Sequence, residues 1–352
     1  MAKVLIIGLG YAGRRFKKAF ENTGTPVEFS YVGRTRQDVP IPYYRFIDEA
    51  LEDFRPDVAV VTVPDLAHAE VLRALSGFDG FVLAEKPLVT SGDDLTPVES
   101  ALRKVSGFCM DLVERYAETT MLLRDLVRED GLTLVRAHFT WGKDRINDHR
   151  PTSGVSSEII HPLDLLQWIC GAGTPMSLET VLGVRSDFSV SGHDVLDSVA
   201  ISARLGSGVV SGYSSFVNIT RKREIDFVFR DRSGDLLYAN AVYDTPVWDA
   251  DRLRVWRRTG AGDVVVHELD TGLRAVPKGA ETVVKLGRMV DDVTRYVASG
   301  RDPNIPFAGL SDAFALQRLL NEMEARAYVT GPVSYFPNGR TVLEEVDWER
   351  LG

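Results

Sequence analysis

The first 118 residues alternate continuous apolar runs with amphipathic segments. Apolar runs without polar alternation suit strands that are buried on both faces of a parallel sheet. The expected strands are residues 3–8, 27–32, 58–63, 81–84 and 107–113, and the helices expected between them are residues 11–22, 67–75 and 95–105. In the first of these helices, Phe16 and Phe20 fall on one face. This order predicts right-handed βαβ units and a doubly wound parallel sheet.

The pattern changes after about residue 118. Helices are expected at residues 121–128 and 158–170, on either side of a strand at 133–141. Between residues 183 and 256, apolar and polar positions alternate in several strands, which is typical of an antiparallel sheet with one covered face. Two closing helices are expected at residues 282–298 and 310–328. The pattern therefore predicts an α/β domain at residues 1–118 and, at residues 119–352, an α+β domain built on an open, mainly antiparallel sheet.

Length and composition narrow the class of protein. A chain of 352 residues suits two domains. The net charge of -9 argues against nucleic-acid binding, and no apolar run is long enough to indicate a membrane span or a signal peptide. The two cysteines, Cys109 and Cys170, indicate neither a disulfide framework nor a cysteine-based zinc site. We expect a cytoplasmic protein whose partner is a small molecule rather than nucleic acid or membrane.

A glycine-rich turn joins the first expected strand to the first helix. It reads Gly8, Leu9, Gly10, Tyr11, Ala12 and Gly13, a G-x-G-x-x-G pattern. In this pattern the first glycine permits a tight turn, the second lets the backbone approach a pyrophosphate, and the third allows close packing of helix on strand. The helix N-terminus also favours the phosphate charge. Between a buried strand and a helix, the pattern predicts a Rossmann domain whose residues 8–13 contact a dinucleotide.

The end of the second strand indicates which nucleotide binds. Sites for NAD place an Asp or Glu there, which accepts hydrogen bonds from the adenosine ribose. This chain has Arg34, Thr35 and Arg36 instead, and no carboxylate before Asp38. A guanidinium offers a planar fork of donors that suits a 2′-phosphate, so the segment predicts NADP in preference to NAD. The alternative interpretation is a solvated turn with surface arginines.

With these motifs, the chain resembles the Gfo/Idh/MocA family of NAD(P)-dependent oxidoreductases. Beyond the glycine-rich turn, the resemblance rests on the segments at residues 62–68, 84–88, 115–116 and 161–164. The most specific of them is Ala84-Glu85-Lys86-Pro87-Leu88, at the end of an expected strand of the nucleotide domain. The resemblance covers nearly the whole chain and is stronger up to residue 118 than beyond it.

The resemblance implies roles for residues of the first domain. Lys86 is implied to lie at the nicotinamide and the substrate, where an ammonium would stabilise the alkoxide character that develops during hydride transfer. The alternative for Lys86 is a surface lysine after a strand. Glu85 is implied near the nicotinamide ribose, with Pro87 in the same cofactor site. Pro64 and His68 are implied to line the cofactor cleft, although His68 fits a helix-face residue equally well.

His161 is the candidate general acid or base, because imidazole exchanges protons near neutral pH. It occupies the position of the family's histidine. The family commonly carries an aspartate four residues earlier, where this chain has Ser157, followed by Glu158. Both lie near His161 on a regular helix, although Pro162 biases His161 away from helical geometry. Either Glu158 replaces the missing carboxylate, or the site works with Lys86 and His161 alone.

Three further polar residues are candidate substrate ligands. Arg115 belongs to the family's Arg-Tyr segment, and Asp164 lies one turn beyond His161, where it is either a ligand or a helix-face carboxylate. Arg145 lies in a charged loop at residues 143–150, which also contains His149. Such a loop suits recognition of hydroxyls or carboxylates and suits plain solvation equally well. The histidines show no spacing that indicates a metal site.

These features predict reversible hydride transfer between NADP(H) and a hydroxyl or carbonyl of a sugar, cyclitol or related polar metabolite. The same architecture also suits reduction of a carbon–nitrogen double bond by NADPH, a non-catalytic NADPH-binding regulator, and a hydrolase or lyase that uses nicotinamide transiently. Lys86 and His161 favour an enzyme over a regulator. The resemblance implies a homodimer or homotetramer formed through the open face of the C-terminal sheet.

Overall fold

The computed structural model describes residues 1–146, 152–171, 174–190, 195–276 and 278–339. The chain divides into two compact units, the first made of Met1–Tyr116 with Val276–Asn321, and the second of Ala117–Ala275 with the chain from Glu322 onward. The first change of unit lies close to the boundary expected at residue 118. Residues 276–321, which we expected in the second domain, belong instead to the first unit.

Helix α7 (Val284–Ser299) accounts for this return to the first unit. It packs against α1 (Tyr11–Glu21). Two side chains of α1 also bind the segment before α7: Arg15 donates to the Thr282 carbonyl at 2.6 Å and Lys18 to the Glu281 carbonyl at 3.1 Å. Contacts between residues so far apart in the chain cannot be seen in the local pattern of apolar and polar residues. A single boundary at residue 118 therefore placed this helix in the second domain.

The first unit contains a six-stranded parallel sheet in the order β3-β2-β1-β4-β5-β6. Its strands are β1 (Ala2–Ile7), β2 (Val27–Val32), β3 (Tyr43–Tyr44), β4 (Val58–Val61), β5 (Phe81–Ala84) and β6 (Gly107–Met110). Every residue of β4 and β5 is buried, as their continuous apolar runs predicted. The doubly wound parallel sheet is thereby confirmed, and its strand order reverses between β1 and β4. Ligands of such sheets bind beyond the carboxyl ends of the strands at this reversal.

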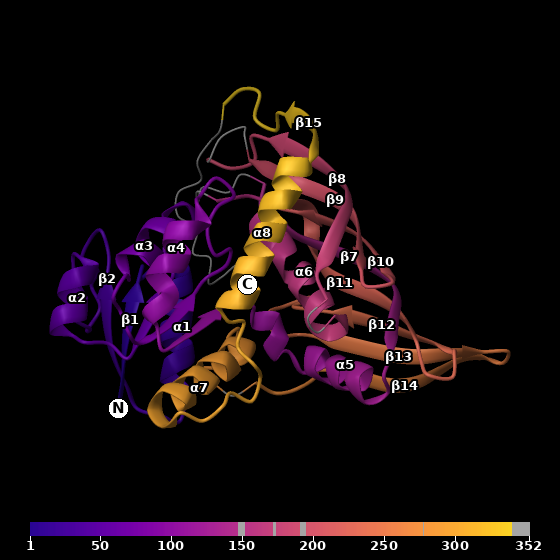
Figure 1. Ribbon diagram of the computed structural model, residues 1–352, viewed down its shortest axis with the longest axis horizontal. Helices are drawn as coiled ribbons and strands as arrows, with labels where there is room; N and C mark the ends of the chain where they lie inside the picture. Colours follow the sequence, from indigo (N-terminus) through magenta and orange to yellow (C-terminus); the bar gives the residue numbers. More distant parts are fainter. Residues whose placement is uncertain (147–151, 172–173, 191–194, 277, 340–352) are drawn as a thin grey trace. The chain divides into compact units, whose positions relative to one another are not determined.

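Helices flank this sheet (Figure 1). Helix α1 buries Phe16, Ala19 and Phe20, the face that the sequence predicted. The other helices and 3₁₀ turns are α2 (Ile47–Asp53), η1 (Asp65–Ala67), α3 (His68–Ala74), α4 (Leu95–Ala101), η2 (Leu102–Lys104), η3 (Val113–Tyr116), α7, and α8 (Leu310–Arg326), which runs on into the second unit.

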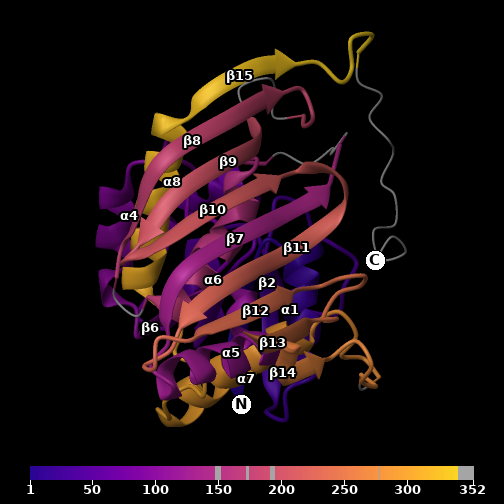
Figure 2. The same cartoon turned by 90° about the vertical axis from the view of Figure 1, so that its right-hand side faces the viewer.

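The second unit is built on a nine-stranded sheet in the order β14-β13-β12-β11-β7-β10-β9-β8-β15, seen face-on in Figure 2. Its strands are β7 (Thr133–Asp144), β8 (Met176–Ser186), β9 (Leu196–Leu205), β10 (Gly208–Ser215), β11 (Val217–Arg230), β12 (Leu236–Val242), β13 (Arg252–Thr259), β14 (Gly262–Asp270) and β15 (Tyr328–Val333). Among the strand pairs of the described residues, only β7 with β10 and β8 with β15 are parallel. The mainly antiparallel sheet is therefore confirmed.

Helices α5 (Glu118–Glu129) and α6 (Ser156–Cys170) contact this sheet: α5 packs on β13, and α6 on β7, β9 and β10. Helix α6 continues through Pro162, so His161 keeps helical geometry despite the bias that the proline introduces. A proline in a helix removes one backbone donor, and the twelve buried residues of α6 hold the helix in place despite that loss. Among the residues described, no helix combines the length and apolarity that crossing a membrane requires.

Candidate functional site

The glycine-rich turn has the geometry that a dinucleotide requires. Gly8 has a φ of +99°, and a side chain there would place its Cβ 2.9 Å from the Thr62 carbonyl oxygen. At Gly13 a Cβ would overlap the Gly8 carbonyl oxygen, so only glycine lets α1 pack this closely on the turn. A Cβ at Gly10 would meet nothing within 4 Å. The turn is thus closed toward the protein at Gly8 and Gly13 and open at Gly10, which fits a pyrophosphate lying over Gly10.

The N-terminus of α1 suits the same negative ligand. Gly10 caps the helix without a side chain, and the first turn carries no acidic residue. Tyr11 is exposed and Ala12 is half-buried in this first turn. Free N–H groups and the helix dipole at such an end attract phosphate.

Beyond β2, the predicted phosphate-binding residues Arg34, Thr35 and Arg36 are all exposed. Sequence reasoning missed Gln37, which connects this loop to the glycine turn. Its amide donates to the Leu9 carbonyl at 2.8 Å and accepts from the Arg14 guanidinium at 2.9 Å. Nothing in the local sequence marks a glutamine for this role, because both partners come from the neighbouring βα turn.

At the carboxyl end of β4, Pro64 begins the turn η1 and His68 begins α3. His68 is buried, and its two ring nitrogens lie 2.7 Å from the Pro87 carbonyl and 2.9 Å from the Val63 carbonyl. Both neighbours are carbonyl oxygens, so a neutral imidazole donates its single N–H to one of them at a time. The ring of His68 connects the Lys86–Pro87 segment to the end of β4. A contact between His68 and the cofactor stays a prediction.

Glu85 and Lys86 follow β5 at the carboxyl edge of the sheet, and both are half-buried. The Glu85 carboxylate accepts a hydrogen bond from the Lys86 backbone N–H at 3.2 Å. Asp111, which sequence reasoning did not single out, follows β6 at the same edge. Burial, and then repulsion from Glu85, raises the pKa of Asp111 to about 8, while the charges of Arg15 and Lys86 act in the opposite direction.

Arg115, a predicted substrate ligand, is buried in the first unit. Its guanidinium forms an ion pair with Asp312 of α8 at 2.9 Å. This pair joins η3 to the returning C-terminal segment of the unit, which is a structural task. A role in substrate binding stays a prediction.

In the second unit, His161 lies on α6 and is only 5% exposed. Its ring stacks on the indole of Trp141 in β7, with ring centroids 5.7 Å apart and an angle of 28° between the planes. The same indole lies 5.3 Å from the guanidinium carbon of Arg223 in β11. Trp141 is fully buried, so the sheet fixes the plane of the imidazole.

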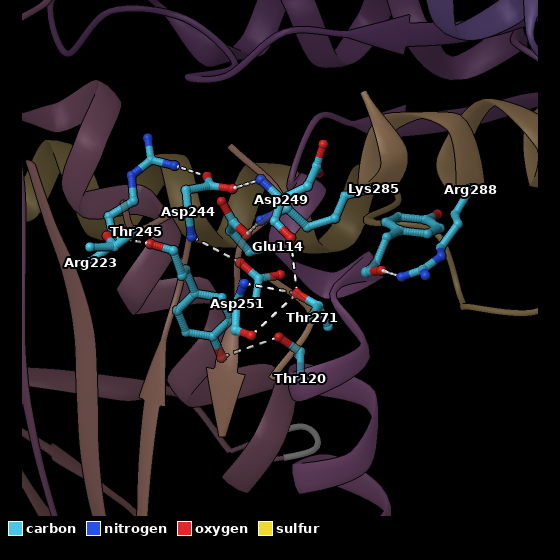
Figure 3. A network of polar contacts seen from close by, with 12 residues as sticks. Glu114, Thr120, Arg223, Asp244, Thr245, Asp249, Asp251, Thr271, Lys285 and Arg288 are labelled. Atoms are coloured by element: carbon cyan, nitrogen blue, oxygen red, sulfur yellow. Dashed lines mark hydrogen bonds and ion pairs between the residues drawn. The ribbon is translucent and has the colours of Figure 1, made fainter. Parts of the chain in front are cut away.

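Glu158 is fully buried, and its carboxylate forms ion pairs with Lys143 and, at 3.5 Å, with Arg223. Arg223 is also paired with Asp244 (Figure 3). Asp244 in turn accepts from the Asp249 backbone N–H at 2.8 Å. The sequence left open whether Glu158 pairs with His161; in the structure, each Glu158 oxygen faces a cation from the sheet. A carboxylate in such a network neutralises buried charge, and its partners come from strands that the helix sequence does not reveal.

The remaining candidates lie on α6 or just after the strand that precedes it. Ser157 donates to the Gly154 carbonyl at 3.1 Å, and Asp164 is buried on α6. Arg145 follows β7, and its guanidinium carbon lies 5.9 Å from the ring centre of Phe216. His149 and the rest of the charged loop from residue 147 onward lie outside the described residues.

Comparison with known proteins finds a match over the nucleotide-binding part of the chain. Residues 2–110 match the Gfo/Idh/MocA family, described as an oxidoreductase family with an NAD-binding Rossmann fold. The match covers the nucleotide-binding part of the chain, which is therefore similar to the Gfo/Idh/MocA oxidoreductases.

Individual relatives are distant. The chain is 22% identical to an inositol 2-dehydrogenase from Salmonella paratyphi B over 181 residues, which cover 47% of this chain and 54% of the relative. It thus spans about half the length of the curated relatives it matches. Among solved structures, a levoglucosan dehydrogenase in complex with NADH has a TM-score of 0.68 at 15% identity, covering 92% of this chain and 96% of its own. A 3-ketoreductase from Actinomadura kijaniata, in complex with TDP-benzene and NADP, has a TM-score of 0.68 at 16% identity, covering 95% and 99%. At these identities the structures establish the fold.

Proposed function

We propose that this protein is an NADP(H)-dependent oxidoreductase that transfers a hydride to or from a carbonyl or hydroxyl group of a sugar, cyclitol or related polar metabolite. Two features together carry the proposal. The backbone at Gly10, which precedes α1, is open to a ligand, and Lys86 follows the carboxyl end of β5. The names of the relatives, an inositol and a levoglucosan dehydrogenase, support polar cyclic substrates.

Residues of the chain would divide the work as follows. A bound nicotinamide cofactor would supply or accept the hydride. Lys86 would hold its ammonium against the substrate oxygen and stabilise the negative charge that develops there. His161 would exchange a proton with a substrate hydroxyl, in the ring plane that its stacking on Trp141 sets. Glu158 would act indirectly, by neutralising Lys143 and Arg223 beneath α6.

The preference for NADP is part of the proposal. It is supported by the exposed Arg34, Thr35 and Arg36 at the end of β2, where Gln37 ties the loop to the glycine turn. Two arginines and a hydroxyl offer donors to a 2′-phosphate. One structural neighbour was solved with NADP and another with NADH, so relatives of this fold use both nucleotides.

We further propose that the protein is a homo-oligomer assembled through the outer face of the nine-stranded sheet. Four residues stand in register across four neighbouring strands of that sheet: Tyr213, Ala200, Leu182 and Tyr328. Leu182 is 51% exposed and Tyr328 is 75% exposed. An apolar row of this kind on an open face suits contact with a second copy.

The test of the function is turnover of NADPH and NADP⁺ with a panel of keto-sugars, polyols and cyclic imines. With an active substrate, Lys86→Ala should lower kcat by roughly 10²- to 10³-fold and leave NADPH affinity nearly unchanged, because one positioned electrostatic donor is lost. Lys104→Ala, which removes an exposed lysine of η2, is the matched control and should keep full activity. Unaltered turnover in the Lys86 variant would show that the lysine is structural.

A further inference from the structure

Asp111 is a buried carboxyl group at the same edge of the sheet as Lys86, and the proposed function leaves it without a task. It follows β6 as Glu85 follows β5. Since Ala84 pairs with Met110 in the parallel ladder, the two acidic residues occupy adjacent positions just beyond the strands. The Asp111 backbone N–H donates to the Ala84 carbonyl at 2.7 Å, which keeps the two strand ends together.

The surroundings of Asp111 favour its neutral form. It is 8% exposed, and its Oδ1 has no hydrogen-bond partner among the residues that the structure describes. The titratable groups that face it are Glu85 and Lys86 after β5, Arg15 of α1, and the Cys109 thiol of its own strand. An ionised Asp111 would have a poorly solvated oxygen and would be repelled by the neighbouring Glu85 carboxylate. A proton on Asp111 removes both the desolvation cost and the repulsion.

We propose that Asp111, placed next to Glu85 by the pairing of β5 with β6, stores the proton that Lys86 passes to the substrate oxygen. This inference rests on the proposed function and extends it. Because Asp111 acts through Lys86, it is a positioning residue in this scheme.

The transfers balance as follows in the direction of reduction. The carbonyl carbon gains a hydride, and the oxygen takes a proton from the Lys86 ammonium, which becomes a neutral amine. The Asp111 carboxylic acid then returns a proton to that amine and becomes a carboxylate beside a restored ammonium. Solvent reprotonates Asp111 before the next turnover, and in the direction of oxidation every transfer runs in reverse.

The stored proton can be observed without substrate or cofactor. Infrared difference spectra across a pH titration should show the carbonyl stretch of a protonated carboxylic acid, and this band should disappear as the pH rises through about 8. Asp111→Asn should remove the band. Asp79→Asn, which changes an exposed carboxylate before β5, should keep it.

The coupling to Lys86 has its own measurement. Lys86→Met removes a positive charge that favours the carboxylate, so the band should then disappear at a higher pH than in the wild type. A wild-type protein without the band at neutral pH overturns the proposal, and so does a band whose midpoint is the same in Lys86→Met. Neither result depends on the Asp111 variant folding.

A kinetic arm separates proton storage from a purely structural role. Wild-type reduction should slow as the pH rises through about 8, because Asp111 then starts each turnover as a carboxylate. Asp111→Asn should lack this limb and turn over about 10- to 100-fold more slowly, with NADPH affinity unchanged. A variant with the wild-type rate and profile overturns the storage role. If the band responds to Lys86→Met but no substrate is turned over, the proposed function fails, while the stored proton on Asp111 and its coupling to Lys86 stand on the infrared result.

Discussion

Arg34 stands where a Rossmann domain specific for NAD carries a carboxylate, and its side chain is exposed beyond β2. Arg34→Ala should weaken NADPH binding by about 1.5 to 3 kcal/mol, the contribution of one charge-assisted contact, and should leave NADH binding nearly unchanged. Fluorescence titration of both nucleotides measures the difference.

The matched control for Arg34 is Arg103→Ala, which removes an exposed arginine of η2 and should change neither affinity. Equal losses of NADH and NADPH affinity in Arg34→Ala would mean that the arginine supports the loop rather than the 2′-phosphate.

Glu158 is a residue whose environment differs from the one the helix sequence suggests. Its buried carboxylate faces Lys143 and Arg223, so Glu158→Gln should lower the free energy of unfolding by about 3 kcal/mol, because it leaves buried cations with less compensation. Urea titration gives this value. Glu129→Gln, at the exposed end of α5, is the control and should be nearly neutral.

The competing hypothesis for Glu158 makes a different forecast. If Glu158 were the partner of His161, Glu158→Gln would keep stability and move a His161-dependent limb of the kcat/KM profile to lower pH. Unchanged stability together with that shift would favour the carboxylate–imidazole pair over the ion-pair network.

At the scale of elements, the glycines of the turn from β1 to α1 have two different tasks: Gly10 leaves room for the nucleotide, and Gly13 lets α1 pack on the turn. Gly10→Ala adds a methyl group where nothing lies within 4 Å, so folding should be unaffected while nucleotide affinity falls about tenfold or more, the effect of roughly 1.4 kcal/mol. Gly13→Ala should instead cost about 1 to 3 kcal/mol of stability, because its Cβ overlaps the Gly8 carbonyl oxygen.

Thermal melts without nucleotide and NADPH titrations of both variants check these expectations. A Gly10→Ala protein that binds NADPH like the wild type would place the pyrophosphate away from this turn. Gly13→Ala with an unchanged melting temperature would show that α1 can shift away from the turn at little cost.

Helix α6 illustrates how tertiary contacts override a local rule. Proline after His161 disfavours helical geometry, yet α6 runs from Ser156 to Cys170. The helix is buried along most of its length against β7, β9 and β10, and that packing outweighs the missing backbone hydrogen bond.

At the scale of the whole molecule, the row of Tyr213, Ala200, Leu182 and Tyr328 should lie at the contact between subunits. Leu182→Arg places a charge in this row and should convert the oligomer to a smaller species, because an unpaired charge disfavours an apolar contact. Light scattering after gel filtration measures the mass. Val247→Arg, at an exposed position between β12 and β13, should leave the mass unchanged, whereas a monomeric wild type would refute assembly through this face.

The sequence by itself determined the features that depend on local order. Continuous apolar runs ending in glycine specify buried parallel strands, and the spacing of Gly8, Gly10 and Gly13 specifies a turn in which Gly8 and Gly13 have no room for a side chain. The position of Lys86 at a strand end follows from the same pattern. These features could be predicted because each one depends on only a few consecutive residues.

Only the tertiary structure decided what depends on residues far apart in the chain. The return of residues 276–321 to the first unit, the cations around Glu158, and the adjacency of Asp111 to Glu85 all arise from contacts between separate elements. Asp111 shows the reason most clearly. Asp111 looks like any other aspartate in the sequence, and its pKa is raised because the pairing of β5 with β6 buries it beside a second carboxylate.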